Sequence, residues 1–163
     1  MKNQEPRTKN QGRTPGEPYS YRNLILWQKA QELTLEIVRI VASLPNDRVA
    51  PVMGRQIVRS ASSIGANIAE GHGRYSLAAH RNHLSIAKGS ACETDGWLDL
   101  LHRAGYLDTA AEGRLHDACL EIIRMLTAKI LDLERREQAK GKRIGEEPGE
   151  YLADLPEEPN LRF

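Results

Sequence analysis

Residues 54–71 read GRQIVRSASSIGANIAEG, and this stretch decides the fold. Apolar residues recur here every three or four positions, as they do on one face of a helix. They are Met53, Ile57, Ala61, Ile64 and Ile68. A second stripe carries Ser, Asn and Gln, which suit partly buried hydrogen bonds better than the Lys and Glu of an ordinary surface helix. The many small residues predict a helix that lies very close to its neighbours.

The length of 163 residues fits a single domain with tails, which would bury about 70% of its unfolded surface. No apolar run approaches the roughly 20 residues needed to span a membrane, and the first residues contain no hydrophobic signal core. We therefore expect a cytoplasmic protein. Cys92 and Cys119 have no metal-binding spacing and are predicted to be buried, reduced thiols.

The net charge of +1 is unevenly distributed. Residues 1–20 are polar, contain four basic and two acidic side chains, and are predicted to form a disordered arm. Residues 139–163 are predicted to form an acidic, proline-broken and disordered tail. This tail is interpreted as solvated, although Tyr151, Leu152, Leu155 and Phe163 would allow it to dock on a partner as a short linear motif.

Four amphipathic helices are predicted, joined by short connections. The first spans residues 24–44, and the second runs from Pro51 until Gly71 and Gly73 stop it. The third is capped by Ser76 and ends at Gly105, and the fourth begins at Asp108 or Thr109 with a Thr109–Glu112 capping box and frays near Gly141. No run has the alternation of a strand. Residues 21–138 are therefore predicted to form an all-α, antiparallel up-down-up-down four-helix bundle.

Four blocks of this sequence resemble one family of small four-helix bundles: YRNLILWQKA, QIVRSASSIGANIAEGHGR, LSIAKGSACET and AGYL. That family includes proteins encoded in intervening sequences of bacterial large-subunit ribosomal RNA genes and the accessory variability proteins of diversity-generating retroelements. The resemblance covers about residues 21–135. It implies a bundle that assembles as a homopentamer and, in the retroelement branch, binds a reverse transcriptase and its RNA through a basic outer surface.

The family motifs fall on three of the predicted helices. The matching positions are Trp27 and Ala30 on the first, Gln56, Arg59, Ser63, Asn67, Glu70 and Gly71 on the second, and Ala87, Gly89, Ser90 and Glu93 on the third.

Polar side chains on the second and third helices invite an active-site interpretation. They are Gln56, Asn67, Glu70, Ser90 and Glu93. A di-metal bundle needs Glu-x-x-His pairs, which neither glutamate provides. We interpret the set as a structural polar network, with Arg59 as counter-ion, that fixes the register of the two helices. Glu70→Ala would then cost about 1 to 3 kcal/mol, because it leaves buried partners unpaired.

No catalytic constellation is recognised, so the sequence predicts a protein that is not an enzyme. His80 and His83 lie one turn apart, but a third metal ligand is found only in His72 across the glycine corner. The serines lie on a helix rather than in a strained elbow. Neither a metal nor another cofactor is therefore predicted.

A broken line of basic residues is the remaining candidate for function. It consists of Arg55, Arg59, Arg74, Arg81 and Lys88. Seven-residue spacing places Arg81 and Lys88 on one face, which we expect to be exposed, and several cations on one surface suit the phosphates of RNA or DNA. An ordinary solvated helix face with salt bridges fits the same pattern.

Two functions are compatible with the sequence. The first is a non-enzymatic, oligomeric bundle that binds RNA or serves as a ribonucleoprotein scaffold, as the accessory protein of a reverse transcriptase would. The second is a protein–protein interaction module without a nucleic-acid ligand. The near-neutral charge favours the second, whereas the resemblance and the basic line favour the first.

Overall fold

The computed structural model describes residues 20–145, and side chains as far as Gly141. In this range a 3-10 turn precedes a series of α-helices: η1 (Tyr21–Asn23), α1 (Ile25–Ser43), α2 (Ala50–His72), α3 (Leu77–Arg103) and α4 (Thr109–Gly145). No residue from 20 to 145 lies in a strand. None of these helices is long and apolar enough to cross a membrane. The predicted arm up to residue 19 and the predicted tail after Gly145 lie outside the described residues.

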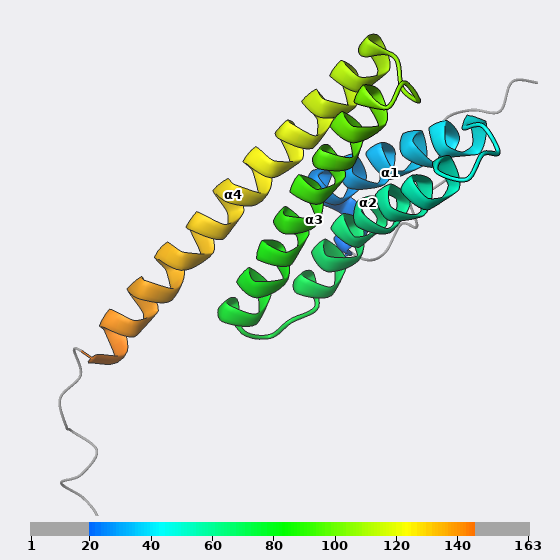
Figure 1. Ribbon diagram of the computed structural model, residues 1–163. Helices are drawn as coiled ribbons and strands as arrows, with labels where there is room; N and C mark the ends of the chain where they lie inside the picture. Colours follow the sequence, from blue (N-terminus) through cyan, green and yellow to red (C-terminus); the bar gives the residue numbers. More distant parts are fainter. Residues whose placement is uncertain (1–19, 146–163) are drawn as a thin grey trace, which may run out of the picture.

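The helices form an antiparallel bundle (Figure 1). α1 and α2 make one hairpin, α3 and α4 make another, and α2 lies against α3. The bundle closes because α1 also contacts α4, through ion pairs of Lys29 with Glu121 at 2.9 Å and of Glu36 with Arg114 at 3.0 Å. The predicted up-down-up-down four-helix bundle is confirmed.

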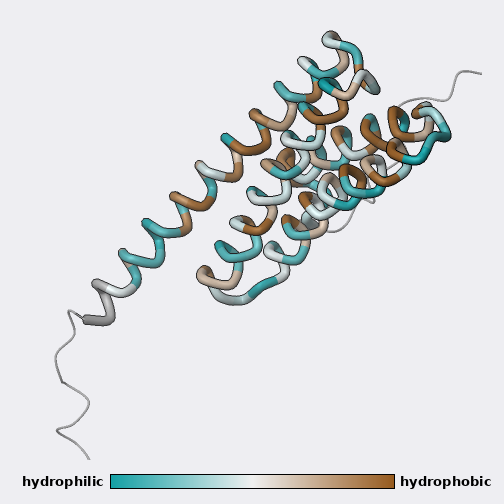
Figure 2. Tube along the Cα trace, in the orientation of Figure 1, coloured by the Kyte–Doolittle hydropathy of each residue, from teal (hydrophilic) through white to brown (hydrophobic). Residues whose placement is uncertain are grey.

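The core is made of one buried stripe from each helix. The predicted apolar stripe of α2 is buried throughout, with Ala61 and Ile64 at 0% exposure in its middle. Hydrophobic residues recur along every helix in Figure 2, whereas the last turns of α4 are mainly hydrophilic. The periodic pattern of apolar residues is therefore what brings the helices together.

Asp47 joins the two connections at one end of the bundle. Its Oδ1 accepts hydrogen bonds from the backbone N–H groups of Val49 and Ala50, each at 2.7 Å, and so caps the start of α2. Its Oδ2 accepts a hydrogen bond from the hydroxyl of Tyr106, in the connection between α3 and α4, at 2.8 Å. The bond from Ala50 is the main reason why the pKa of Asp47 lies below its usual value.

The predicted helix boundaries agree with the structure in most places. Ser76 caps α3, its Oγ accepting from the backbone N–H of Ala79 at 3.1 Å. After α3, Gly105 adopts a φ of +80°, a conformation that glycine adopts at no steric cost. The capping box predicted at Thr109 is wrong: Asp108 caps α4 instead, its Oδ1 accepting from the backbone N–H of Ala111 at 2.8 Å.

α4 is longer than predicted. It continues to Gly145, past the boundary at residue 138 and past the fraying expected near Gly141. The residues after Leu133 are mainly Arg, Glu, Gln, Ala and Lys, which all favour helix, and a single glycine costs only about 1 kcal/mol. As a result, the end of α4 projects beyond the corner between α2 and α3 (Figure 1).

Small residues let α2 approach both of its neighbours. A Cβ atom added at Gly54 would lie 2.8 Å from Cγ1 of Val41 on α1. One added at Gly71 would lie 3.0 Å from Cβ of His83 and 3.3 Å from the carbonyl oxygen of His80, both on α3. The close packing predicted from the sequence of α2 is therefore present at both ends of the helix.

We expect Gly71→Ala to destabilise the protein by about 1 kcal/mol or more. Overpacking against atoms of a neighbouring helix costs about 1 to 3 kcal/mol and exceeds the helix propensity gained. Gly96→Ala is the matched control, because a Cβ there meets nothing within 4 Å, and should stabilise by about 0.5 to 1 kcal/mol. Urea unfolding followed by circular dichroism measures both. Equal stabilisation by the two substitutions would contradict the close approach of α2 and α3.

One of the two cysteines is exposed, contrary to prediction. Cys119 on α4 is buried, and burial raises the pKa of its thiol to about 12. Cys92 lies on α3 and is exposed. The sequence pattern placed it inside an apolar stretch, but the neighbouring Ala91 is the residue that points into the core.

An ion pair between α3 and α4 makes stability depend on pH. His116 Nδ1 lies 2.7 Å from Oδ1 of Asp95, and this hydrogen bond raises the pKa of His116 above its usual value. Because the folded pKa exceeds the unfolded value of about 6.5, the stabilisation is complete below that pH and is lost as the pH rises through the folded pKa.

We therefore expect Asp95→Asn to lower the pKa of His116, as measured by NMR titration. The difference in unfolding free energy between the wild type and this variant should shrink as the pH rises from about 6 to about 8.5. A difference that grows over this range would show that the pair is not stabilising in its charged form. His102→Gln is a suitable control, because His102 contacts the backbone carbonyl of Leu107 rather than a carboxylate.

Candidate functional site

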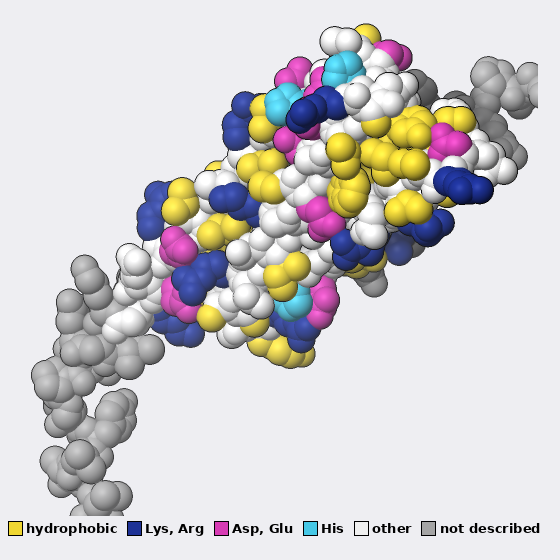
Figure 3. Space-filling model, viewed as in Figure 1, with side chains coloured by type: hydrophobic (Ala, Val, Ile, Leu, Met, Phe, Trp, Pro, Cys, Tyr) yellow, Lys and Arg dark blue, Asp and Glu magenta, His cyan; other side chains and the backbone are white. Residues whose placement is uncertain are grey.

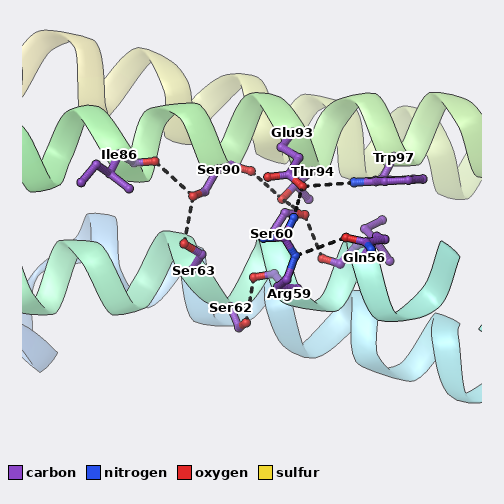
Figure 4. A network of polar contacts seen from close by, with 11 residues as sticks. Gln56, Arg59, Ser60, Ser62, Ser63, Ile86, Ser90, Glu93, Thr94 and Trp97 are labelled. Carbon is purple, nitrogen blue, oxygen red and sulfur yellow. Dashed lines mark hydrogen bonds and ion pairs between the residues drawn. The ribbon is translucent and has the colours of Figure 1, made fainter. Parts of the chain in front are cut away.

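The contact between α2 and α3 is lined by hydroxyl groups, which we call the polar seam: Ser60, Ser63, Ser90 and Thr94. Thr94 Oγ1 lies 2.9 Å from Ser60 Oγ, and Ser90 Oγ lies 3.0 Å from Ser63 Oγ (Figure 4). Thr94 is completely buried and also contacts the backbone carbonyl of Ser90 at 2.8 Å. These contacts satisfy the hydroxyl groups in pairs, so they fix the register of the two helices.

An ion pair between Arg59 and Glu93 lies on the outer side of the polar seam. The guanidinium of Arg59 donates to Oε1 of Glu93 across the two helices at 2.6 Å, and its Nε donates to Oε1 of Gln56 at 3.2 Å. The indole N–H of Trp97 also reaches Glu93, at 3.5 Å (Figure 4). Arg59 therefore acts as the predicted counter-ion, but the side chains of this pair are 67% and 40% exposed.

A second polar group lies at the corner between α2 and α3. Asn67 Nδ2 donates to the backbone carbonyl of Ser63 at 2.9 Å, and its Oδ1 lies 3.4 Å from Nδ1 of His83. Arg74 forms an ion pair with Glu70, and its Nε donates to Nε2 of His83 at 3.1 Å. The side chain of Glu70 is 53% exposed, so this carboxylate lies on the surface.

The predicted polar network is thus divided into parts. Ser90 belongs to the buried seam and Asn67 and Gln56 are half-buried, whereas Glu93 and Glu70 are exposed. The prediction that the two glutamates are buried is wrong, because each extends to an arginine at the protein surface. The sequence analysis missed Thr94, which fits the apolar rhythm of α3 and carries its hydroxyl into the seam.

We now expect Glu70→Ala to cost less than about 1 kcal/mol, rather than the 1 to 3 kcal/mol predicted from the sequence. An exposed ion pair contributes only about 0 to 1 kcal/mol, since water solvates both charges in its absence. Chemical unfolding at two salt concentrations measures this. Thr94→Val, which removes a buried hydroxyl at nearly constant volume, is the comparison and should cost more. A larger loss for Glu70→Ala would restore the buried-network interpretation.

The basic line predicted from the sequence is mostly neutralised by carboxylates. Arg59 pairs with Glu93 and Arg74 pairs with Glu70, as described above. Arg81 pairs with Glu137 of α4 at 2.9 Å and with Glu134 at 3.9 Å. Arg81 is only partly exposed and is paired, because this side of α3 faces α4, and this agrees with the alternative of a helix face with ordinary salt bridges. Lys88 lies one heptad further along the same side and is half-buried.

Arg55 differs from the other predicted arginines. It is exposed, and within residues 20–145 it has no carboxylate partner. Two further arginines at the same end of the α1–α2 hairpin share both properties: Arg39 on α1 and Arg48 in the connection. We call Arg39, Arg48 and Arg55 the basic end.

The sequence analysis missed Arg39 and Arg48, although one signal could have revealed them. Arg39 lies two positions after Ile37, which is buried, and therefore on the outer side of α1. Arg48 lies in the connection NDRVAP, next to the start of α2. Exposure could therefore have been expected for both, at the same end of the helical hairpin as Arg55.

An apolar groove adjoins the basic end, between the end of α1 and the start of α2. Its volume is about 660 Å³. Among the residues that line it are Val41, Leu44, Pro45, Pro51 and Val58, with Arg55 at its edge. Figure 3 shows hydrophobic side chains gathered over this end of the molecule, next to Lys and Arg side chains. This surface offers cations and apolar area together, a combination typical of macromolecular contacts.

The two glutamates that first suggested chemistry are each paired with a guanidinium group, Glu93 with Arg59 and Glu70 with Arg74. Residues 20–145 also contain no group of three or more His, Cys, Asp or Glu side chains that could hold a metal ion.

The fold defines an all-α four-helix bundle protein, with a seam of hydrogen-bonded hydroxyl groups between α2 and α3. The chain belongs to the family of 23S rRNA-intervening sequence proteins, whose family model matches residues 22–128. This result agrees with the resemblance seen in the sequence. No curated protein matches the chain significantly.

A solved structure supports the same assignment. A protein of unknown function from the S23 ribosomal protein family of Bacteroides thetaiotaomicron is 36% identical in sequence. The alignment covers 65% of this chain and 98% of that protein, with a TM-score of 0.62. The match thus spans almost the whole of that protein.

Proposed function

We propose that this protein is a non-enzymatic, self-associating four-helix bundle that binds RNA and serves as a ribonucleoprotein scaffold. The observation that carries the proposal is the basic end: three exposed arginines, Arg39, Arg48 and Arg55, without carboxylate partners among the described residues. Guanidinium groups contact phosphate through two parallel hydrogen bonds, and such contacts dominate the affinity of nucleic-acid binding.

Self-association is part of the proposal. Large apolar side chains are exposed on the outer side of the hairpin, among them Leu35 at 53%, Val38 at 42% and Val52 at 48%. Contact between copies would remove this area from water. A homopentamer, which the resemblance implies, would repeat the basic end five times and turn a small cluster into a multivalent surface. Light scattering tests this, and a monomer at micromolar concentration would contradict it.

Binding to a reverse transcriptase is the most specific part of the proposal, and the resemblance to retroelement accessory proteins alone supports it. We also propose a cytoplasmic location, with which two unpaired cysteines are compatible.

RNA binding is tested by a mobility-shift assay with structured RNA at two salt concentrations. We expect binding at low salt that weakens steeply as the salt concentration rises, because binding releases counterions from the phosphates. A binding affinity that does not change with salt would show that the contact is not made to phosphates. No detectable binding at low salt would exclude the function.

A protein–protein interaction module without a nucleic-acid ligand is the second candidate. It is favoured by the ion pairs that neutralise Arg59, Arg74 and Arg81, together with the apolar groove beside the basic end. A pull-down with the full chain and with a chain that ends at Lys140 distinguishes it from the first. A protein partner that both chains retain in the absence of RNA would support this second function through the groove, and one that is lost with residues 141–163 would support it through the C-terminal segment.

A further inference from the structure

A large groove lies at the opposite end of the bundle from the basic end. It is bounded by the start of α1, the end of α2, the start of α3 and the middle of α4, and its volume is about 980 Å³. Most of its floor is apolar, including Leu24, Ile25, Ile68 and Met125. Ile25, the first residue of α1, is 63% exposed. An apolar floor of this size is typical of a surface that something covers.

The rim of this groove carries a positive charge. Lys129 Nζ and Arg136 Nη2 both approach Asp132, at 3.4 and 3.0 Å, so that two cations share one carboxylate. His72 and His80 complete the polar part of the lining. Burial lowers the pKa of His80, with smaller contributions from Lys129 and the neighbouring histidines, which favours its neutral form. The groove therefore suits an apolar segment that also carries acidic side chains.

We propose that residues 146–163 of the same chain cover this groove, with Tyr151, Leu152 and Leu155 against its apolar floor. This contact is independent of RNA binding, because it lies at the other end of the bundle. The sequence of the segment is EEPGEYLADLPEEPNLRF, which holds six acidic side chains and one basic one. Its apolar residues match the floor and its charge is opposite to that of the rim.

The path of the chain permits this contact. α4 itself lines the groove, from Met125 to Arg136, and then continues for nine residues to Gly145. These nine residues span about 14 Å at the rise of an α-helix. An extended chain returns over that distance in about four or five residues, at about 3.3 Å each. Residues 146–150 are therefore long enough to bring Tyr151 back to the level of Arg136.

The other segment outside the described residues does not match the groove. Residues 1–19 lead directly into η1 beside it, but they contain four basic and two acidic side chains and almost no large apolar residues. They would place cations next to Lys129 and Arg136 and leave the floor uncovered. The charge and the apolar content thus select the C-terminal segment.

Paramagnetic relaxation in the full-length protein tests the contact. A nitroxide is attached at Ala153→Cys in a Cys92→Ser background; Cys119 is buried and stays unlabelled. We expect loss of the methyl signals of Ile25 and Met125, and no change at Val49 and Val52 at the far end of the bundle. A sample that mixes spin-labelled copies with isotope-labelled copies should show no loss.

Two outcomes would overturn the proposal. If the methyl signals are unaffected, the segment does not cover the groove. If the loss is as large in the mixed sample, the occupant comes from a second copy rather than from the same chain. Replacing Leu152 and Leu155 by serine should abolish the effect, whereas Leu161→Ser, a similar change near the end of the chain, should preserve it. If the Leu161→Ser variant loses the paramagnetic effect as fully as the double variant does, Leu152 and Leu155 are not the specific contact residues.

Discussion

Replacing Arg39, Arg48 and Arg55 together by glutamine is expected to weaken RNA binding on the order of 10³-fold. All three are exposed and have no carboxylate partner within residues 20–145, so they are available to phosphates. A hydrogen bond to a charged group contributes about 1.5 to 3 kcal/mol, and three such bonds account for this loss. The dependence of the logarithm of the binding constant on the logarithm of the salt concentration should also fall by about 2 to 3 units.

The matched control removes the same number of positive charges elsewhere. Arg59, Arg74 and Arg81 already contact glutamates, so their replacement by glutamine should change affinity by less than about tenfold. Circular dichroism and light scattering verify that both triple variants keep their fold and their assembly. If the control variant loses as much affinity as the first, RNA contacts the edge of α3 rather than the basic end. If both retain full affinity, binding lies outside these six residues.

The helices were predictable because the signals for them are local. The apolar spacing of α2, the cap at Ser76 and the glycine after α3 each depend on residues only a few positions apart. The main error in length came from Gly141, because the preference of the surrounding residues for helix outweighs one glycine.

The partners of polar residues were less predictable, because they depend on which helices become neighbours. The sequence left open whether Arg81 forms a salt bridge, because its carboxylate partners lie on α4, more than fifty positions along the chain. Thr94 matched the apolar rhythm, and only the approach of α2 shows that its hydroxyl contacts Ser60. In contrast, Arg59 and Glu93 were correctly expected to lie near each other, because both belong to the polar stripes of helices predicted to be adjacent.

The largest expected effect on stability is that of Ile64→Ala. Ile64 lies in the middle of α2, has 0% exposure, and belongs to the core formed with the other helices. Removing three buried carbon atoms loses their transfer free energy and leaves a cavity, and such changes cost about 2 to 5 kcal/mol. That is a large fraction of the total stability of about 5 to 15 kcal/mol typical of a domain.

For a chain of this length, we expect the midpoint of thermal unfolding to fall by about 5 to 20 °C. Ile86→Ala is the control: it removes the same number of carbon atoms from a side chain that is 45% exposed, and it should change the stability by no more than about 0.5 kcal/mol. Both are measured at one protein concentration, since self-association would add to the apparent stability. A loss at Ile86 as large as that at Ile64 would show that the cost does not come from burial in the core. A loss below about 1 kcal/mol at Ile64 would contradict the central position of α2, and with it the interpretation of GRQIVRSASSIGANIAEG as the stretch that decides the fold.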